Sequence, residues 1–161
     1  MAIAVTIIVA AVIAAVDQVI KYFIYENLYP SGKVTVIENL FSLIYTENRG
    51  AAFGIFQDGT IFFIVLASFM LGVFFYLLLK KKFTSKLFYA SAALMIGGGI
   101  GNLIDRVFRH FVIDYLSLSF FPPICNFADY CITVGAVLLV ISIMFASDNK
   151  TEENGGSEND E

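Results

Sequence analysis

The class of this protein is indicated most directly by residues 59–79, which read GTIFFIVLASFMLGVFFYLLL. This run of 21 residues has no charged side chain, and a helix of about 20 mostly apolar residues spans the hydrocarbon core of a bilayer. Further charge-free runs occupy residues 1–16, 87–104 and 130–147. The first is long enough only if its helix continues through Asp17 and Lys21. We therefore predict four transmembrane helices, at about residues 1–28, 59–79, 87–105 and 127–147.

The composition of the whole chain also indicates a membrane protein. Of its 161 residues, 58% are hydrophobic and 15% are charged, whereas a soluble domain has about 45–50% apolar and about 25% charged residues. The mean hydropathy is +0.79. Two cysteines are too few for a disulfide framework, and a net charge of −4 gives no basis for nucleic-acid binding.

The basic residues predict the orientation in the membrane. Four of the ten lie within seven positions, at Lys80, Lys81, Lys82 and Lys86, and short cytoplasmic loops are rich in lysine and arginine. Both termini are then cytoplasmic, and the long connections at 29–57 and 105–128 face outside. Residues 148–161 hold six acidic residues and one lysine among Asn, Gly and Ser, so we predict a disordered cytoplasmic tail there.

The first apolar run has an alternative interpretation as a cleaved signal peptide. It lacks a basic segment at its start, and Asp17 and Gln18 follow where a cleavage site would need small residues. We therefore favour a retained first helix.

The outer connections have the pattern of short strands. Residues 34–37 and 40–45 are β-branched or aromatic runs bounded by turn residues, which predicts an outer β element at about 29–57. Phe41, Leu43 and Tyr45 would share one of its faces. Residues 111–113 could add a strand, and Pro122-Pro123 is expected to break the chain before the last helix. The predicted fold is an all-α membrane protein with a small β element, an antiparallel sheet on the outer membrane surface, followed by the tail.

Ionisable and amide side chains gather near the outer ends of the predicted helices. Such residues in or beside spanning helices are costly and often functional. They are Asp17, Lys21, Asp105, Arg106, Asp114 and Asp129, with Asn48, Asn102 and Asn126. No comparable acidic group lies on the inner side before the tail, so the pattern favours one site near the outer interface over a path across the bilayer.

Local structure offers an explanation for several of these residues. Asp17 and Lys21 are four positions apart and can pair on one helix face. Asn126 followed by Asp129 fits a helix N-cap with an acidic third residue. Asp105-Arg106 fits an anchor at the membrane interface.

Other motifs do not indicate a separate site. Gly97 and Gly101 are expected to let helices approach closely. Cys125 and Cys131 with the single His110 are too few for a zinc site, and we expect both cysteines to be packing thiols.

Asp114 has the weakest structural explanation, because it lies within an apolar run and nothing nearby in the sequence neutralises it. Two carboxylates held close together share a proton. One can then take a proton from water while the other protonates a substrate carbonyl. Asp114 paired with Asp129 would suit such hydrolysis, although spacing alone does not bring them together.

Five motifs in order resemble those of bacterial lipoprotein signal peptidase, also called signal peptidase II. They are Asp17-Gln18-Val19-Ile20-Lys21, Asn48-Arg49-Gly50-Ala51-Ala52-Phe53, Gly101-Asn102-Leu103-Ile104-Asp105-Arg106, Val112-Ile113-Asp114-Tyr115 and Asn126-Phe127-Ala128-Asp129. The resemblance covers nearly the whole chain except the tail. Two departures are visible, since Cys125 stands where an aromatic residue is expected and Tyr115 where Phe is usual.

The resemblance implies an aspartic endopeptidase of the bacterial cytoplasmic membrane, with its site at the outer face. It implies that Asp114 and Asp129 are the catalytic pair and that no metal or other cofactor takes part. The substrates would be prolipoproteins, cut just before a diacylglyceryl-modified cysteine, and the other partners would be membrane lipids around a monomer. Substrate-site residues would be Asn48, Gly50, Asn102, Arg106 and Asn126, and supporting residues would be Asp17, Lys21 and Asp105.

Two other function classes compete with a peptidase. A four-helix transporter or channel subunit would need ionisable residues along a path, and the inner halves of the last three predicted helices offer none. A non-catalytic assembly protein with an outer binding sheet would explain the helices but would leave Asp114 unexplained.

Overall fold

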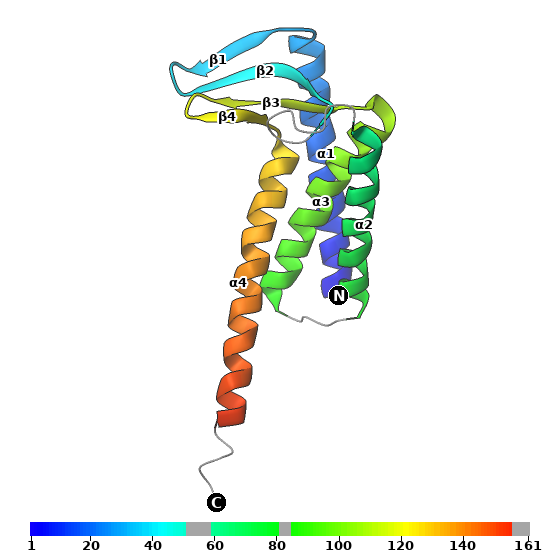
Figure 1. Cartoon of the computed structure of the whole chain (residues 1–161), viewed down its shortest axis with the longest axis vertical. Helices are drawn as coiled ribbons and strands as arrows, with labels where there is room; N and C mark the ends of the chain where they lie inside the picture. Colours follow the sequence, from blue (N-terminus) through cyan, green and yellow to red (C-terminus); the bar gives the residue numbers. More distant parts are fainter. Residues whose placement is uncertain (51–58, 81–84, 156–161) are drawn as a thin grey trace, which may run out of the picture.

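The computed structural model describes residues 1–50, 59–80 and 85–155, with side chains through residue 145. Its helices are α1 (Ala2–Leu28), α2 (Thr60–Leu79), α3 (Lys86–Arg109) and α4 (Phe127–Gly155). Its strands are β1 (Lys33–Ile37), β2 (Phe41–Asn48), β3 (Val112–Leu118) and β4 (Phe121–Cys125). The sheet lies across one end of the helices (Figure 1). All four helices are long and apolar enough to cross a membrane, which confirms the predicted fold class.

Helix α3 is the central helix of the bundle and contacts each of the other three. Its glycines allow this approach. A Cβ on Gly97 would lie 2.8 Å from the Ala10 carbonyl oxygen of α1, and one on Gly101 would lie 2.5 Å from a carboxylate oxygen of Asp17. The predicted role of Gly97 and Gly101 in close helix packing is therefore confirmed.

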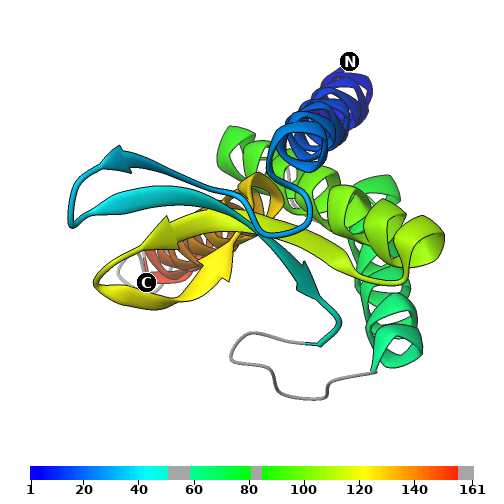
Figure 2. The same cartoon turned by 90° about the horizontal axis from the view of Figure 1, so that it is seen from above.

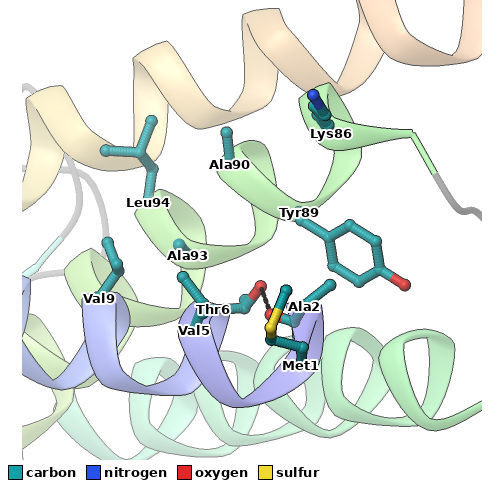
Figure 3. Close-up of a pocket in the computed structure, with 10 residues that line it drawn as sticks. All are labelled: Met1, Ala2, Val5, Thr6, Val9, Lys86, Tyr89, Ala90, Ala93 and Leu94. Atoms are coloured by element: carbon teal, nitrogen blue, oxygen red, sulfur yellow. Dashed lines mark hydrogen bonds between the residues drawn. The ribbon is translucent and has the colours of Figure 1, made fainter.

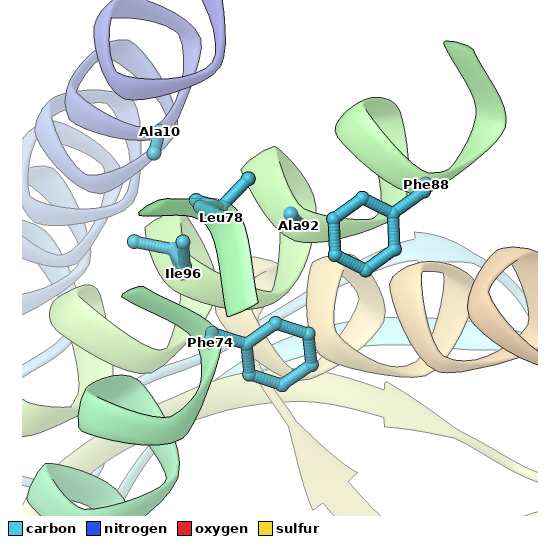
Figure 4. Close-up of a cluster of buried hydrophobic side chains, with 6 residues drawn as sticks. All are labelled: Ala10, Phe74, Leu78, Phe88, Ala92 and Ile96. Atoms are coloured by element: carbon cyan, nitrogen blue, oxygen red, sulfur yellow. The ribbon is translucent and has the colours of Figure 1, made fainter. Parts of the chain in front are cut away.

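A cluster of apolar side chains joins α1, α2 and α3 (Figure 4). Phe74 and Leu78 are the two buried residues of α2, and they pack against Phe88, Ala92 and Ile96 of α3. The rest of α2 is apolar on all sides and mostly exposed, as expected for a helix that faces lipid.

The four strands form one antiparallel sheet in the order β1-β2-β3-β4. Figure 2 shows the strands lying across the ends of the helices. Ile24 and Leu28 at the end of α1 pack against Tyr45, Ile113 and Tyr115. This contact fixes the sheet over the C-terminal end of α1.

The β element is larger than predicted. The strands expected at 34–37 and 40–45 are present as β1 and β2, and the strand suggested at 111–113 is present as β3. Strand β4 was not expected, and the β element therefore extends beyond the predicted limit of 29–57. Pro122 and Pro123 do not end the chain's extended structure. They lie in β4, an edge strand, and an edge tolerates residues without a backbone N–H.

Helix α4 continues to Gly155, whereas we predicted a disordered tail from residue 148. Lys and Glu are good helix formers, and they extend a helix that already spans the membrane. Residues 156–161 of the predicted tail lie outside the described residues.

Candidate active site

The two aspartates singled out from the sequence line the same pocket. Asp114 comes from β3 and is 3% exposed, while Asp129 lies in the first turn of α4 and is half-buried. The pocket has a volume of about 270 Å³. It is lined by Asn48, Gly50, Arg106, Asp114, Pro123, Ile124, Cys125, Asp129, Ile132 and Thr133.

Asn126 connects the two carboxylates. Its backbone N–H donates to Asp129 Oδ2 and its Oδ1 accepts from the Asp129 N–H, both at 3.0 Å. This reciprocal pair confirms the predicted helix cap. The same side chain donates through Nδ2 to Asp114 Oδ1 at 2.7 Å. A cap that begins α4 therefore also holds the two carboxylates beside each other.

Two further asparagines donate to the carboxylates. Asn48 Nδ2 lies 2.8 Å from Asp114 Oδ2, and Asn102 Nδ2 lies 2.8 Å from Asp129 Oδ1. Strand register explains the first contact, because Thr46 pairs with Asp114 and Asn48 is two residues further along β2. Each carboxylate oxygen thus accepts one hydrogen bond from the surrounding protein.

A buried lysine lies behind this pair. Lys21 Nζ is 2.8 Å from Asp17 Oδ2, Asp105 Oδ2 and Asn102 Oδ1. The side chains of all three charged residues are 0% exposed. The predicted pairing of Asp17 with Lys21 is confirmed, but Asp105 is no interfacial anchor, since it faces the buried lysine.

The carboxylates of Asp17 and Asp105 also accept hydrogen bonds from backbone N–H groups of β3 and α4, the two elements that carry Asp114 and Asp129. Asp105 Oδ2 accepts from the N–H of Ile113, the residue before Asp114, at 3.2 Å. Asp17 Oδ1 accepts from the N–H of Ala128, the residue before Asp129, at 3.2 Å. The charges of α1 and α3 therefore position β3 and α4 beside the pocket.

The environment of Asp114 favours its protonated form. Burial raises the pKa of this carboxyl to about 7, and the negative charge of Asp129 acts in the same direction. The hydrogen bonds from Asn48 and Asn126 favour the ionised form and oppose this shift. Burial and the two carboxylates also raise the pKa of the Cys125 thiol to about 11, so that thiol stays protonated at neutral pH.

Arg106 and Gly50 complete the predicted set. Arg106 lines the pocket with its guanidinium 5.2 Å from the centre of the Phe63 ring, close enough for a cation–π contact. Gly50 is buried and donates its N–H to Asn48 Oδ1 at 3.0 Å, which turns the Asn48 amide group towards Asp114.

Sequence reasoning missed several residues of this region, including Pro123 and Ile124 of the pocket lining. Gln18 Nε2 donates to Asp105 Oδ1 at 3.1 Å, and Arg109 forms an ion pair with the same carboxylate. Ile132 and Thr133 line the pocket. Helical spacing was the available signal, since Arg109 is four residues after Asp105, and Ile132 and Thr133 are three and four after Asp129.

The two departures from the family motifs, Tyr115 and Cys125, leave the carboxylates of Asp114 and Asp129 in place. The Tyr115 hydroxyl accepts a hydrogen bond from the Phe127 N–H at 3.2 Å, and Cys125 lines the pocket. Both cysteines are free, as predicted.

Comparison with known proteins identifies the family. Residues 9–145 match the family model described as signal peptidase (SPase) II. The chain belongs to the signal peptidase II family. Members of this family are membrane aspartic endopeptidases, and they remove signal peptides from prolipoproteins. This membership overturns the transporter and assembly-protein alternatives.

Two relatives in the signal peptidase II family match over most of their length. The chain is 42% identical over 139 residues to the lipoprotein signal peptidase of Caldanaerobacter subterraneus, a match that covers 86% of this chain and 95% of the relative. It is 36% identical over 148 residues to the lipoprotein signal peptidase of Clostridium acetobutylicum, covering 89% and 96%.

Two solved structures, each described as a bacterial membrane enzyme, share the fold. One superposes with a TM-score of 0.84 and 29% identity, covering 92% of each chain. The other has a TM-score of 0.79 and 29% identity, covering 88% of this chain and 93% of that one. The arrangement of four helices and a small antiparallel sheet is therefore shared with experimentally determined membrane enzymes.

Proposed function

We propose that Asp114 and Asp129 are the catalytic pair of this signal peptidase and that they cut a prolipoprotein just before its diacylglyceryl-modified cysteine. The observation that carries the proposal is the single pocket lined by both carboxylates, which Asn126 connects. Such a pair can exchange one proton between water and substrate.

The different environments of the two carboxylates suggest their roles. Asp114 is the more buried, and its raised pKa suits a group that enters the reaction protonated. Asp129 is more accessible and would take a proton from water. The resulting hydroxide attacks the scissile carbonyl carbon while Asp114 protonates the carbonyl oxygen, which gives a tetrahedral diol.

The second step returns both groups to their starting state. The bond between the carbonyl carbon and the cysteine nitrogen breaks, and Asp129 gives its proton to that nitrogen. The diol returns a proton to Asp114 as it becomes the carboxylic acid. The products are the free signal peptide and a lipidated chain with a new amino terminus.

The remaining pocket residues would bind and orient the substrate. Arg106 supplies a positive charge beside the two carboxylates, suited to a peptide carbonyl or a lipid ester oxygen. Asn48, Asn102 and Asn126 hold the carboxylates in position. Lys21, Asp17 and Asp105 would support the same geometry. The protein would act as a monomer surrounded by membrane lipid.

We further propose that the site faces outside and that both termini are cytoplasmic. The lysines at 80–86 mark the cytoplasmic end of the bundle, and the sheet lies at the opposite end. After both native cysteines are replaced by Ser, Thr35→Cys should react with an impermeant thiol reagent on intact cells. Thr84→Cys should react only after lysis. Labelling of Thr35→Cys only after lysis would contradict this topology.

The residues beyond the last span should be dispensable for cleavage. Residues 148–155 form the end of α4 that lies farthest from the sheet (Figure 1), so they do not reach the pocket. A truncation after Ser147 should cleave a lipidated precursor within about twofold of the full chain. Membrane fractionation provides the control for insertion. A truncated chain that inserts normally but no longer cleaves would refute this expectation.

A further inference from the structure

A second, larger pocket lies at the end of the bundle away from the sheet. It has a volume of about 490 Å³ and lies between α1 and α3. Figure 3 shows side chains of the two helices facing each other across it. We call it the α1–α3 groove, and its lining is Met1, Ala2, Val5, Thr6, Val9, Lys86, Tyr89, Ala90, Ala93 and Leu94.

The interior of the α1–α3 groove suits hydrocarbon. Alanines at positions 90 and 93 leave the space open on α3, and valines at 5 and 9 line it on α1. The Thr6 hydroxyl is already satisfied, because it donates to the Ala2 carbonyl oxygen at 3.0 Å. The side chains of Val5, Val9, Ala93 and Leu94 are hydrocarbon and offer no hydrogen bond to a polar ligand.

The mouth of the groove is positively charged. Lys86 is exposed there and has no ion pair with any carboxylate in the described part of the chain. Helices α1 and α3 both begin at this end, and neither has an acidic residue in its first turn. A helix N-terminus attracts anions, and the sequence has no Asp or Glu between residues 59 and 104.

We propose that the α1–α3 groove binds one acyl chain of an anionic phospholipid, with the phosphate beside Lys86 at the start of α3. Lipid tails are as apolar as the groove, so burial of the chain alone would not select one lipid from another. The selectivity comes from the charge at the mouth, because a lysine near the bilayer surface favours anionic lipids. This proposal is independent of the proposed catalytic roles.

Thermal unfolding of the full chain in neutral detergent tests the proposal. Phosphatidylglycerol and phosphatidylcholine with identical dioleoyl chains are added in separate titrations. We expect phosphatidylglycerol to raise the Tm by about 2–4 °C more than phosphatidylcholine does. Inorganic phosphate should produce no such shift, because it lacks the acyl chain.

Two variants separate the groove from its mouth. Ala90→Phe fills the groove and should lose most of the stabilisation by phosphatidylglycerol. Lys86→Gln should keep the response to phosphatidylcholine and lose the preference for the anionic lipid. Two matched controls should behave as the parent chain does. Val65→Phe adds the same ring to an exposed position on α2, and Lys80→Gln removes a lysine whose ammonium lies 5.8 Å from the centre of the Tyr76 ring.

Three results would overturn the proposal. These are equal stabilisation of the parent chain by both lipids, a preference for phosphatidylglycerol that survives both Ala90→Phe and Lys86→Gln, and an equal shift with inorganic phosphate. Cleavage of precursor should be unchanged in Lys86→Gln, so failure of the catalytic proposal would appear in a different measurement.

Discussion

Asp114→Asn and Asp129→Asn should each lower the rate of precursor cleavage by at least about a hundredfold. An amide has nearly the shape of a carboxyl group but does not act as a general acid or base, and such catalysis contributes about 10²–10⁴-fold. Insertion should be preserved, since removing a charge near lipid does not raise its cost. The measurement is release of the signal peptide from a diacylglyceryl-modified precursor by the purified variants.

Glu47→Gln is a matched control for the two aspartate variants. Glu47 lies on β2 next to β3 and pairs with Arg49 outside the pocket lining, so its loss should leave cleavage nearly normal. The parent enzyme should lose activity at alkaline pH, because Asp114 must enter the reaction protonated. A chelator should have no effect. Near-normal cleavage by either Asn variant, or chelator inhibition reversed by added metal, would exclude the proposed pair.

Lys21→Met should destabilise the folded protein by about 3–5 kcal/mol, the usual cost of removing one partner from a buried ion pair. Its ammonium is the shared partner of Asp17 and Asp105, both fully buried. The substitution leaves two carboxylates with less compensation and also removes the hydrogen bond that orients Asn102. Denaturant unfolding in detergent measures the loss.

Two further variants show whether charge causes this loss. Arg49→Met breaks the exposed pair with Glu47 and should cost less than about 1 kcal/mol. Asp17→Asn combined with Lys21→Met should recover part of the stability, because one uncompensated charge is removed. If Lys21→Met unfolds no more easily than Arg49→Met, the buried lysine does not stabilise the site as described.

The helices were predictable because spanning a bilayer imposes a long charge-free run on each of them. Most of the candidate site was predictable because charges near lipid are unusual and because five motifs resemble a family. The spacing of Asp114 and Asp129 did not by itself predict that they meet, since their joining depends on the Asn126 cap and on strand pairing between distant residues. The part played by Arg109 was also missed, although its spacing from Asp105 was visible.

Strand β4 shows why a local signal misled the prediction. A Pro-Pro pair usually ends regular structure, and the sequence does not reveal that the strand it lies in is at an edge. The outcome depended on the order of strands in the sheet, which is a property of the whole fold.

The prolines of β4 also make the two edges of the sheet unequal. Pro122 and Pro123 remove two backbone donors from β4, and because successive N–H positions of a strand point to opposite sides, one of them is lost from the free edge that borders the pocket. Another chain therefore finds a poor template for strand addition there. The opposite edge, β1, has no proline and is exposed along its whole length. Self-association of the extracted protein through β-strands would thus begin at β1 rather than at β4, and charged substitutions along β1 are the place to improve its solubility.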